Sequence, residues 1–358
     1  IYAERIASGK IKTRESNDRS LDKFLKTQSS NMRDYADACF RYLRATGLVN
    51  VSHIGKSLSI IHERIADVDY ILNTVDREPC FVDDEQNYIA YLGNAEFPRL
   101  LTDNKQMLIE RLTTKFKGIQ IPQGASVEEL KDLLFDYTEA YKTETIEKQV
   151  REIKDYKLYD DIQNTFRQIK NNELYDAPLM LEWNTWRAMT MLNGGKIKAN
   201  LNFDDFGNPL STAQGNMADI VCDYGDYMLS VEVTMSSGQK QYDMEGEPVS
   251  RHLGKLKKAS EKPCYCLFLA PKINEACVAH FYALHSLNIS YYGGKSTIVP
   301  LPIDVFQKML EDSYRVSYTP TSAHVRKFFE YSNELVKTCK NEIEWFEKLK
   351  QSAMNWLG

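Results

Sequence analysis

The sequence predicts an α/β (α+β) protein in which a mixed sheet flanked by helices follows a mainly helical amino-terminal region. Two observations support this class. Apolar residues recur at helical spacing through much of residues 1–150, whereas residues 151–358 alternate helical segments with short apolar runs typical of strands. The length of 358 residues exceeds that of one small core, so we expect two or three domains. Because the chain begins at Ile1 in mid-pattern, we also expect it to be part of a longer protein.

Residues 1–75 combine a helix, a glycine and two short strands. The stretch "DYADACFRYLRATGLV" has apolar residues at helical spacing and predicts a helix that ends at Gly47. The stretch "LVNVSHIGKSLSIIHE" then predicts two strands around Ser52–Lys56, with Gly55 in the turn, and "HERIADVDYILNTV" predicts another helix. This order is typical of a winged-helix domain, although other α+β domains share it.

Charge is unevenly distributed along the chain. Residues 1–60 contain 11 Lys/Arg and 6 Asp/Glu, a charge of +5, which leaves −10 for the remainder of a chain whose formal charge is −5. A basic segment joined to an acidic remainder is typical of a polyanion-binding module, and chance scatter of charge is the alternative.

Residues 76–150 resemble a helical connector. Proline and glycine interrupt the first half of this region, and "SVEELKDLLFDYTEAYKTETIEKQVREI" predicts one long amphipathic helix. Ser126, followed three residues later by Glu129, predicts a capping box at its start. We interpret this region as a structural linker.

Residues 151–358 predict the mixed sheet. Two helices, "YDDIQNTFRQIK" and "APLMLEWNTWRAMTML", precede a hairpin, "MADIVCDYGDYMLSVEVTM", at residues 217–235. A basic helix, "SRHLGKLKKAS", follows, and then the strand "CYCLFLAP", the helix "EACVAHFYALHSL", the strand "STIVPLPI" and helices to the end. Strands that alternate with helices indicate a sheet with helices on its faces.

The hairpin carries two acids that a hairpin does not need. With Tyr224 and Gly225 at the centre of the turn, Asp219 lies opposite Ser230, and Glu232 is the next residue on the same face. The opposite face is wholly apolar and predicts core: Ala218, Ile220, Cys222, Leu229, Val231, Val233 and Met235. The two acids are then diagonal neighbours with Cα atoms roughly 7 Å apart or less.

Two carboxylates at that distance repel each other, and a divalent cation between them would reverse the sign of the interaction. The alternative is a pair of solvated side chains on an exposed face. Three features favour the metal: Glu182 in an otherwise apolar helix, Thr234 next after Glu232 on the same face, and a basic helix in which His252 and Lys255 share one side.

The order of these residues, Glu182…Asp219-x12-Glu232-Val233-Thr234, resembles the PD-(D/E)XK nuclease superfamily. The wider text, "LEWNTWRAM", "ADIVCDYGDYMLSVEVTMSSG" and "SRHLGKLKKA", resembles the cleavage domain of the AlwI/BstNBI group of bacterial type IIS restriction and nicking endonucleases. The resemblance implies a remnant of a winged-helix DNA-recognition region at 1–75, a helical linker at 76–150 and a PD-(D/E)XK nuclease domain at 151–358. The first part of the recognition region would precede Ile1.

The resemblance also implies the roles of the site residues. Metal binding falls to Asp219, Glu232 and Glu182, and further active-site side chains are Glu245, His252 and Lys255. The position that usually holds lysine is Thr234, which has no positive charge. Either Lys255 takes its place or the metal acts alone. We expect DNA backbone contacts from the remaining basic residues of this region: Arg251, Lys257, Lys258 and Lys262.

The implied function is hydrolysis of a phosphodiester bond in double-stranded DNA at a fixed offset from a short asymmetric site, leaving 5′-phosphate and 3′-hydroxyl ends. Mg²⁺ would activate the attacking water, and we expect Mn²⁺ to substitute. One active site cuts one strand, so double-strand cleavage needs a second catalytic subunit or self-association, and the sequence is compatible with a nickase or a double-strand cutter. The alternatives are a winged-helix DNA-binding regulator without catalysis and a DNA repair or junction nuclease of the same superfamily.

Cysteine usage and hydropathy indicate the compartment. The seven cysteines are scattered, mostly in apolar runs, and form no C-x-x-C pair, so we interpret them as reduced core thiols of a cytoplasmic protein. The family resemblance implies that this protein is bacterial. No apolar run approaches about 18 residues, so no membrane span is expected.

Overall fold

The computed structural model describes residues 2–13, 17–51, 57–78, 81–93, 104–192, 195–204, 206–213, 215–315 and 320–357. Two compact units divide the chain, Ile1–Val127 and Glu128–Gly358. Within the described ranges, every helix is too short or too polar to cross a membrane. The division into recognition region, linker and nuclease domain remains a prediction.

The first unit is mainly helical. Its longest helix, α2 (Leu21–Ala45), begins at Ser20, whose side chain accepts a hydrogen bond from the Lys23 N–H at 3.3 Å. Strands β1 (Val49–Val51) and β2 (Leu58–Ile60) pair in antiparallel fashion, which confirms the two predicted strands. The predicted turn at 52–56, with Gly55, lies outside the described residues, and the winged-helix character stays a prediction. The other elements are α1 (Ala3–Ala7), η1 (His62–Arg64), α3 (Ile65–Thr74), α4 (Glu85–Leu92) and α5 (Lys105–Lys115).

The second unit is built on a five-stranded sheet. Its strand order is β3-β6-β7-β8-β9, in which the first two pairings are antiparallel and the last two are parallel, so the predicted mixed sheet is confirmed. The strands are β3 (Lys196–Ala199), β6 (Ile220–Asp223), β7 (Met228–Val233), β8 (Cys264–Ala270) and β9 (Ile298–Pro302). A separate two-stranded hairpin pairs β4 (Asn202–Phe203) with β5 (Pro209–Ser211).

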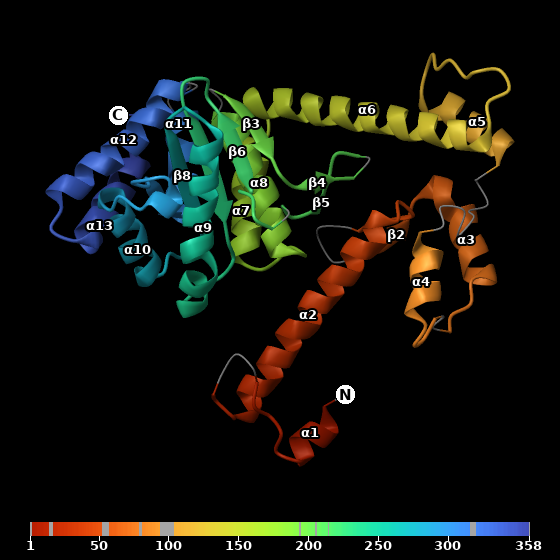
Figure 1. Cartoon of the computed structure of the whole chain (residues 1–358), viewed down its shortest axis with the longest axis horizontal. Coiled ribbons are helices and arrows are strands. Elements are labelled where there is room, and N and C mark those ends of the chain that lie inside the picture. The colour runs from red at the N-terminus through yellow and green to blue at the C-terminus, as the bar shows by residue number, and fades with distance from the viewer. Residues whose placement is uncertain are drawn as a thin grey trace. The chain divides into compact units, whose positions relative to one another are not determined.

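Helices cover both faces of this sheet (Figure 1). Every residue of the interior strand β8 is buried, as expected for a strand with helices on each side. One face packs on α7 (Tyr159–Lys170), α8 (Ala177–Leu192), α11 (Ile303–Arg315), α12 (Ser322–Thr338) and α13 (Glu342–Met354). The other face packs on α9 (Gln239–Ala259) and α10 (Glu275–Ser286). The long predicted helix is α6 (Val127–Lys154), whose Ile153 enters the first of these cores.

The register of the β6–β7 hairpin differs from the predicted one by two residues. Ile220 pairs with Val231 and Asp223 with Met228, so the loop holds four residues rather than the predicted central pair Tyr224 and Gly225. The physical reason is that Tyr224 and Tyr227 are both buried, where their rings stack with centroids 4.7 Å apart. Extended by one residue, this register places Asp219 directly opposite Glu232 instead of diagonal to it. The apolar face is as predicted, because a shift of two residues preserves the alternation of side chains.

Helix α9 is fixed along one side by the segment that contains η2 (Ser290–Tyr292). A Cβ atom at Gly254 would lie 2.9 Å from the Tyr292 Cα, so only glycine allows this close approach. The Lys257 ammonium donates to the carbonyl oxygens of Tyr292 at 3.4 Å and Lys295 at 2.6 Å, and to Ser296 Oγ at 2.9 Å. This lysine, expected to contact DNA, therefore holds the protein's own chain.

The substitution Gly254→Ala should lower the free energy of unfolding by about 1–3 kcal/mol, because main-chain atoms of Tyr292 must move to admit the methyl group. The matched control is Gly246→Ala in the same helix. Its Cβ would meet ring atoms of the partly exposed Tyr242 side chain at 3.2 Å, and that side chain is able to move. Urea unfolding of both variants measures the difference, and equal destabilisation would contradict the close-approach argument.

Candidate active site

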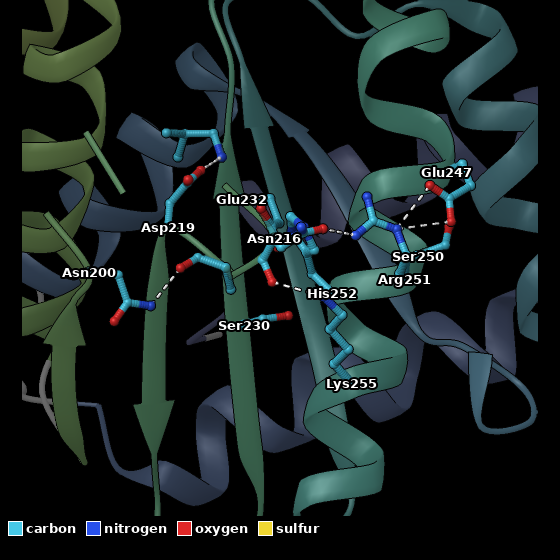
Figure 2. A network of polar contacts seen from close by, with 12 residues as sticks. Asn200, Asn216, Asp219, Ser230, Glu232, Glu247, Ser250, Arg251, His252 and Lys255 are labelled. Atoms are coloured by element: carbon cyan, nitrogen blue, oxygen red, sulfur yellow. Dashed lines mark hydrogen bonds and ion pairs between the residues drawn. The ribbon is translucent and has the colours of Figure 1, made fainter. Parts of the chain in front are cut away.

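Three acids from separate segments gather at one end of the β6–β7 hairpin. Glu182 lies in α8 with only 7% of its surface exposed, and its Oε2 accepts a hydrogen bond from the Ala213 N–H at 3.0 Å. Asp219 immediately precedes β6, and its Oδ2 accepts from the Val233 N–H at 2.8 Å. Glu232 lies in β7 and is 5% exposed. Figure 2 shows Asp219 and Glu232 on neighbouring strands, on the side of the sheet that faces α9.

These carboxylates lie close enough to act on one another. Burial, and then the charge of Asp219, raises the pKa of Glu182 to about 8. Burial, and then the charge of Glu232, raises the pKa of Asp219 well above its ordinary value. The pKa of Glu232 is also raised, first by burial and then by the charges of Glu245 and Glu182. The acids therefore form one electrostatic cluster, which we call the carboxylate cluster: Glu182, Asp219, Glu232 and Glu245.

Helix α9 brings two further predicted residues to this cluster. Glu245 and His252 are seven positions apart, so they lie on the same face two turns from each other. His252 Nδ1 lies 3.0 Å from Glu232 Oε1, while His252 Nε2 is buried and has no hydrogen-bond partner among the described residues. Burial, followed by the charges of Arg251 and Lys255, lowers the pKa of His252. In the neutral tautomer whose Nδ1–H donates to Glu232, Nε2 is an acceptor.

Thr234, the position at which the family resemblance implies a lysine, contacts an acid instead. Thr234 is buried, and its side chain is hydrogen-bonded to Glu245, which lowers the pKa of that carboxyl against the larger opposing effect of burial. The predicted substitute, Lys255, is exposed and donates from Nζ to the main-chain oxygen of Asn216 at 3.1 Å. All six predicted site residues thus belong to one connected set, with Lys255 at its edge.

Sequence reasoning missed the contribution of the loop before β6. Asn216 receives hydrogen bonds from both Lys255 and Arg251. The charge of Arg251 opposes the rise that burial and the neighbouring acids cause in the pKa of Glu232. Arg251 was expected to meet only the DNA backbone. The Gly-Asn pair at 215–216 is a turn signal, and it was the only sign in the sequence that a shaped loop precedes Asp219.

Among the described residues, no group of three or more His, Cys, Asp or Glu side chains is arranged to hold a metal ion. The chemistry of the donors nevertheless fits a hard divalent cation, because such ions prefer carboxylate oxygens. Burying several like charges together is unfavourable unless a positive charge compensates them. The unpartnered Nε2 of His252 adds a buried acceptor beside the same acids.

In metal-free protein, Glu182→Gln should remove a pH-dependent loss of stability. An acid whose pKa is raised on folding contributes stability below its unfolded pKa, near 4.5, and loses it as the pH rises to about 8. The wild type should therefore lose about 3–5 kcal/mol of unfolding free energy over that range through this group, whereas the glutamine variant should not. Urea unfolding in a chelator at pH 5 and pH 9 measures this change. The exposed Glu261→Gln serves as control, and equal pH slopes for wild type and Glu182→Gln would contradict the assignment.

Comparison with known proteins identifies the family. No curated protein matches the sequence. Among solved structures, the small subunit (R.BspD6I2) of the heterodimeric restriction endonuclease R.BspD6I is similar, with 24% sequence identity over 55% of this chain and 95% of that chain, and a TM-score of 0.44. The family model for the AlwI restriction endonuclease matches residues 3–309, a span that contains every predicted site residue. The chain therefore belongs to the AlwI restriction endonuclease family.

Proposed function

We propose that this restriction endonuclease has a PD-(D/E)XK active site that hydrolyses one phosphodiester bond of double-stranded DNA, at a fixed offset from a short asymmetric site. The observation that carries the proposal is the carboxylate cluster, in which acids from α8, the loop before β6, and β7 meet His252 of α9. Membership of a restriction endonuclease family gives these acids a phosphodiester as their target.

Three acids would hold the catalytic ion, which we propose to be Mg²⁺, with Mn²⁺ able to substitute: Asp219, Glu232 and Glu182. When bound, such an ion lowers the pKa of a coordinated water and neutralises negative charge that develops on the phosphate. The hydrogen bonds from Val233 N–H to Asp219 and from Ala213 N–H to Glu182 fix one oxygen of each carboxylate. The second oxygen of each of these two carboxylates would then be available to bind the ion.

The remaining site residues would act on protons and on the phosphate. His252, held by Glu232, presents Nε2 as an acceptor that could take a proton from the attacking water or contact a phosphate oxygen. Glu245 is held by Thr234 and adds negative charge beside Glu232. Lys255 lies exposed at the edge of the cluster, where it would orient water or stabilise charge on the phosphate.

Double-stranded DNA would lie along the basic side of α9. Arg251, Lys255 and the exposed Lys258 offer positive charge for backbone phosphates, which would make binding depend on salt concentration. The basic residues within 1–75 would belong to the recognition region, 76–150 to the linker and 151–358 to the nuclease domain of a cytoplasmic enzyme.

The single carboxylate cluster in the described chain would cut one DNA strand. Cleavage of both strands would require a second catalytic subunit or self-association, and cleavage of one strand would make the protein a nickase. Supercoiled plasmid that ends as nicked circle without linear product would identify a nickase, whereas linear product would show that both strands are cut.

Asp219→Asn and Glu232→Gln should each slow Mg²⁺-dependent plasmid nicking by about 10³-fold or more, because each removes a charged ligand of the catalytic ion. DNA binding, measured by gel shift in Ca²⁺, should persist, since the basic face of α9 is unchanged. Wild-type protein in a chelator should bind without cutting.

The matched control is Asp226→Asn in the tip of the same hairpin, where the exposed carboxylate pairs with Arg326 at 2.8 Å. It should cut at close to the wild-type rate. Undiminished nicking by either site variant would defeat the site assignment. Binding by the wild type without cleavage in Mg²⁺ or Mn²⁺ would favour a DNA-binding regulator, and cleavage of branched DNA in preference to a fixed sequence would favour a repair or junction nuclease.

A further inference from the structure

The loop between β5 and β6 is tied to three different elements around the carboxylate cluster. The Ala213 N–H donates to Glu182 of α8, and Asn216 accepts hydrogen bonds from two side chains of α9. Farther along, Asn200 beside β3 donates from Nδ2 to the main-chain oxygen of Ala218 at 2.6 Å and from its main-chain N–H to the main-chain oxygen of Asp219 at 2.9 Å. The described residues on either side of position 214 are therefore held by contacts with α8, with the residue after β3 and with α9.

Asn216 uses two oxygens to hold two cations. Its Oδ1 accepts from Arg251 Nη1, and its main-chain oxygen accepts from Lys255 Nζ at 3.1 Å (Figure 2). The φ of Asn216 is +70°, a left-handed conformation that glycine and asparagine adopt more readily than other residues. With the backbone in this conformation, both oxygens of Asn216 accept hydrogen bonds from α9.

Arg251 is held on two sides. Its Nε lies 3.2 Å from both carboxylate oxygens of Glu247, one turn earlier in α9, while Nη1 binds Asn216. Its side chain is 25% exposed. Within the described chain, these contacts use Nε and Nη1, so Nη2 remains for a ligand oxygen, and the planar guanidinium suits a phosphate.

The position of Arg251 connects it to the chemistry of the cluster. Its neighbour in sequence, His252, contacts Glu232 at 3.0 Å. Burial and the charges of Glu245 and Glu182 raise the pKa of Glu232, and the positive charge of Arg251 opposes that rise. Thr234, where a nuclease of this type would carry a lysine, provides no charge. Arg251 is therefore a guanidinium group beside the cluster that contacts on two sides fix in place.

We propose that Asn216 is a positioning residue that holds Arg251 toward the scissile phosphate, where Arg251 supplies the positive charge that Thr234 lacks. This inference rests on the proposed nuclease function. Without the Asn216 side chain, the long arginine side chain would occupy several rotamers, and fewer molecules would present the guanidinium to the phosphate. Lys255 binds the main-chain oxygen of residue 216, which any residue provides, so substitution of Asn216 should affect Arg251 and spare Lys255.

Single-turnover cleavage in Mg²⁺ tests this arrangement as a double-mutant cycle. Asn216→Gly keeps the left-handed backbone and should slow cleavage about 5-fold, the effect of one hydrogen bond, whereas Arg251→Met should slow it about 10²-fold. The double variant should be no slower than Arg251→Met alone, because Asn216 acts through Arg251. In the matched background Lys255→Met, Asn216→Gly should still slow cleavage about 5-fold. Asn216→Asp retains an acceptor for Arg251 and should restore the rate.

Thermal unfolding of each variant separates this role from a general effect on folding, since glycine accommodates a φ of +70° and Asn216→Gly should unfold with the wild type. If that variant proves unstable, the Asn216→Asp rate alone decides, and a loss of rate there overturns the proposal. Two further results would overturn the proposal: equal slowing by Asn216→Gly in the wild-type and Arg251→Met backgrounds, or cleavage at the wild-type rate by Arg251→Met. In either case, metal-dependent cleavage by the wild type would still support the nuclease function. Absence of cleavage by the wild type would instead refute the nuclease function.

Discussion

Repulsion between buried carboxylates is the constraint that the surrounding structure satisfies. Glu182 and Glu232 are almost completely buried, and burial, followed by the charges of neighbouring acids, raises the pKa values of Glu182, Asp219 and Glu232. Charged groups removed from water are costly unless hydrogen bonds or opposite charges compensate them. The fold provides that compensation locally, through the Ala213 and Val233 N–H groups, the His252 ring and the guanidinium of Arg251. The remaining negative charge makes the cluster suited to a divalent cation.

The path of the chain explains why α9 contributes so much to this cluster. Strands β7 and β8 are parallel neighbours, so the chain must return to the same end of the sheet between them, and α9 is the connection. The return places Glu245 and His252 over the face of β7 that carries Glu232. On the far side of the helix, Gly254 and Lys257 bind the η2 segment. The helix is therefore fixed between the sheet and this segment, which limits how far its site residues can move.

Local patterns predicted the elements well and the contacts between distant segments poorly. Helices α7 and α8 match the predicted segments from end to end, because their apolar spacing is complete. The start of α9 was missed, because the helix begins at Gln239 and continues through Pro248. Near its start, the buried Gln241 side chain donates hydrogen bonds to the main-chain oxygens of Ser236 and Lys272. The short strand β3 was missed because its alternating lysines and its position at the edge of the sheet leave little apolar pattern.

The candidate site could be predicted only where the type and spacing of its residues indicate their chemistry. The carboxylates and His252 were predicted as site residues from their spacing and from family resemblance. The hairpin register was not, since the burial of Tyr224 and Tyr227 depends on helices far away in the sequence. The role of Asn216 was also out of reach, because its partners are 35 and 39 residues distant and no periodic pattern joins them.

The tip of the β6–β7 hairpin has a consequence for protein engineering. The Tyr227 hydroxyl donates to the Ser322 main-chain oxygen at 2.7 Å, and Trp345 of α13 is fully buried in the core beneath the same sheet. Ser322 and Trp345 both lie beyond residue 309, where the match to the family ends. A chimaera that joins this nuclease to another DNA-binding protein must therefore retain α12 and α13, since a boundary drawn at the end of the family match would expose one side of the sheet that carries the acids.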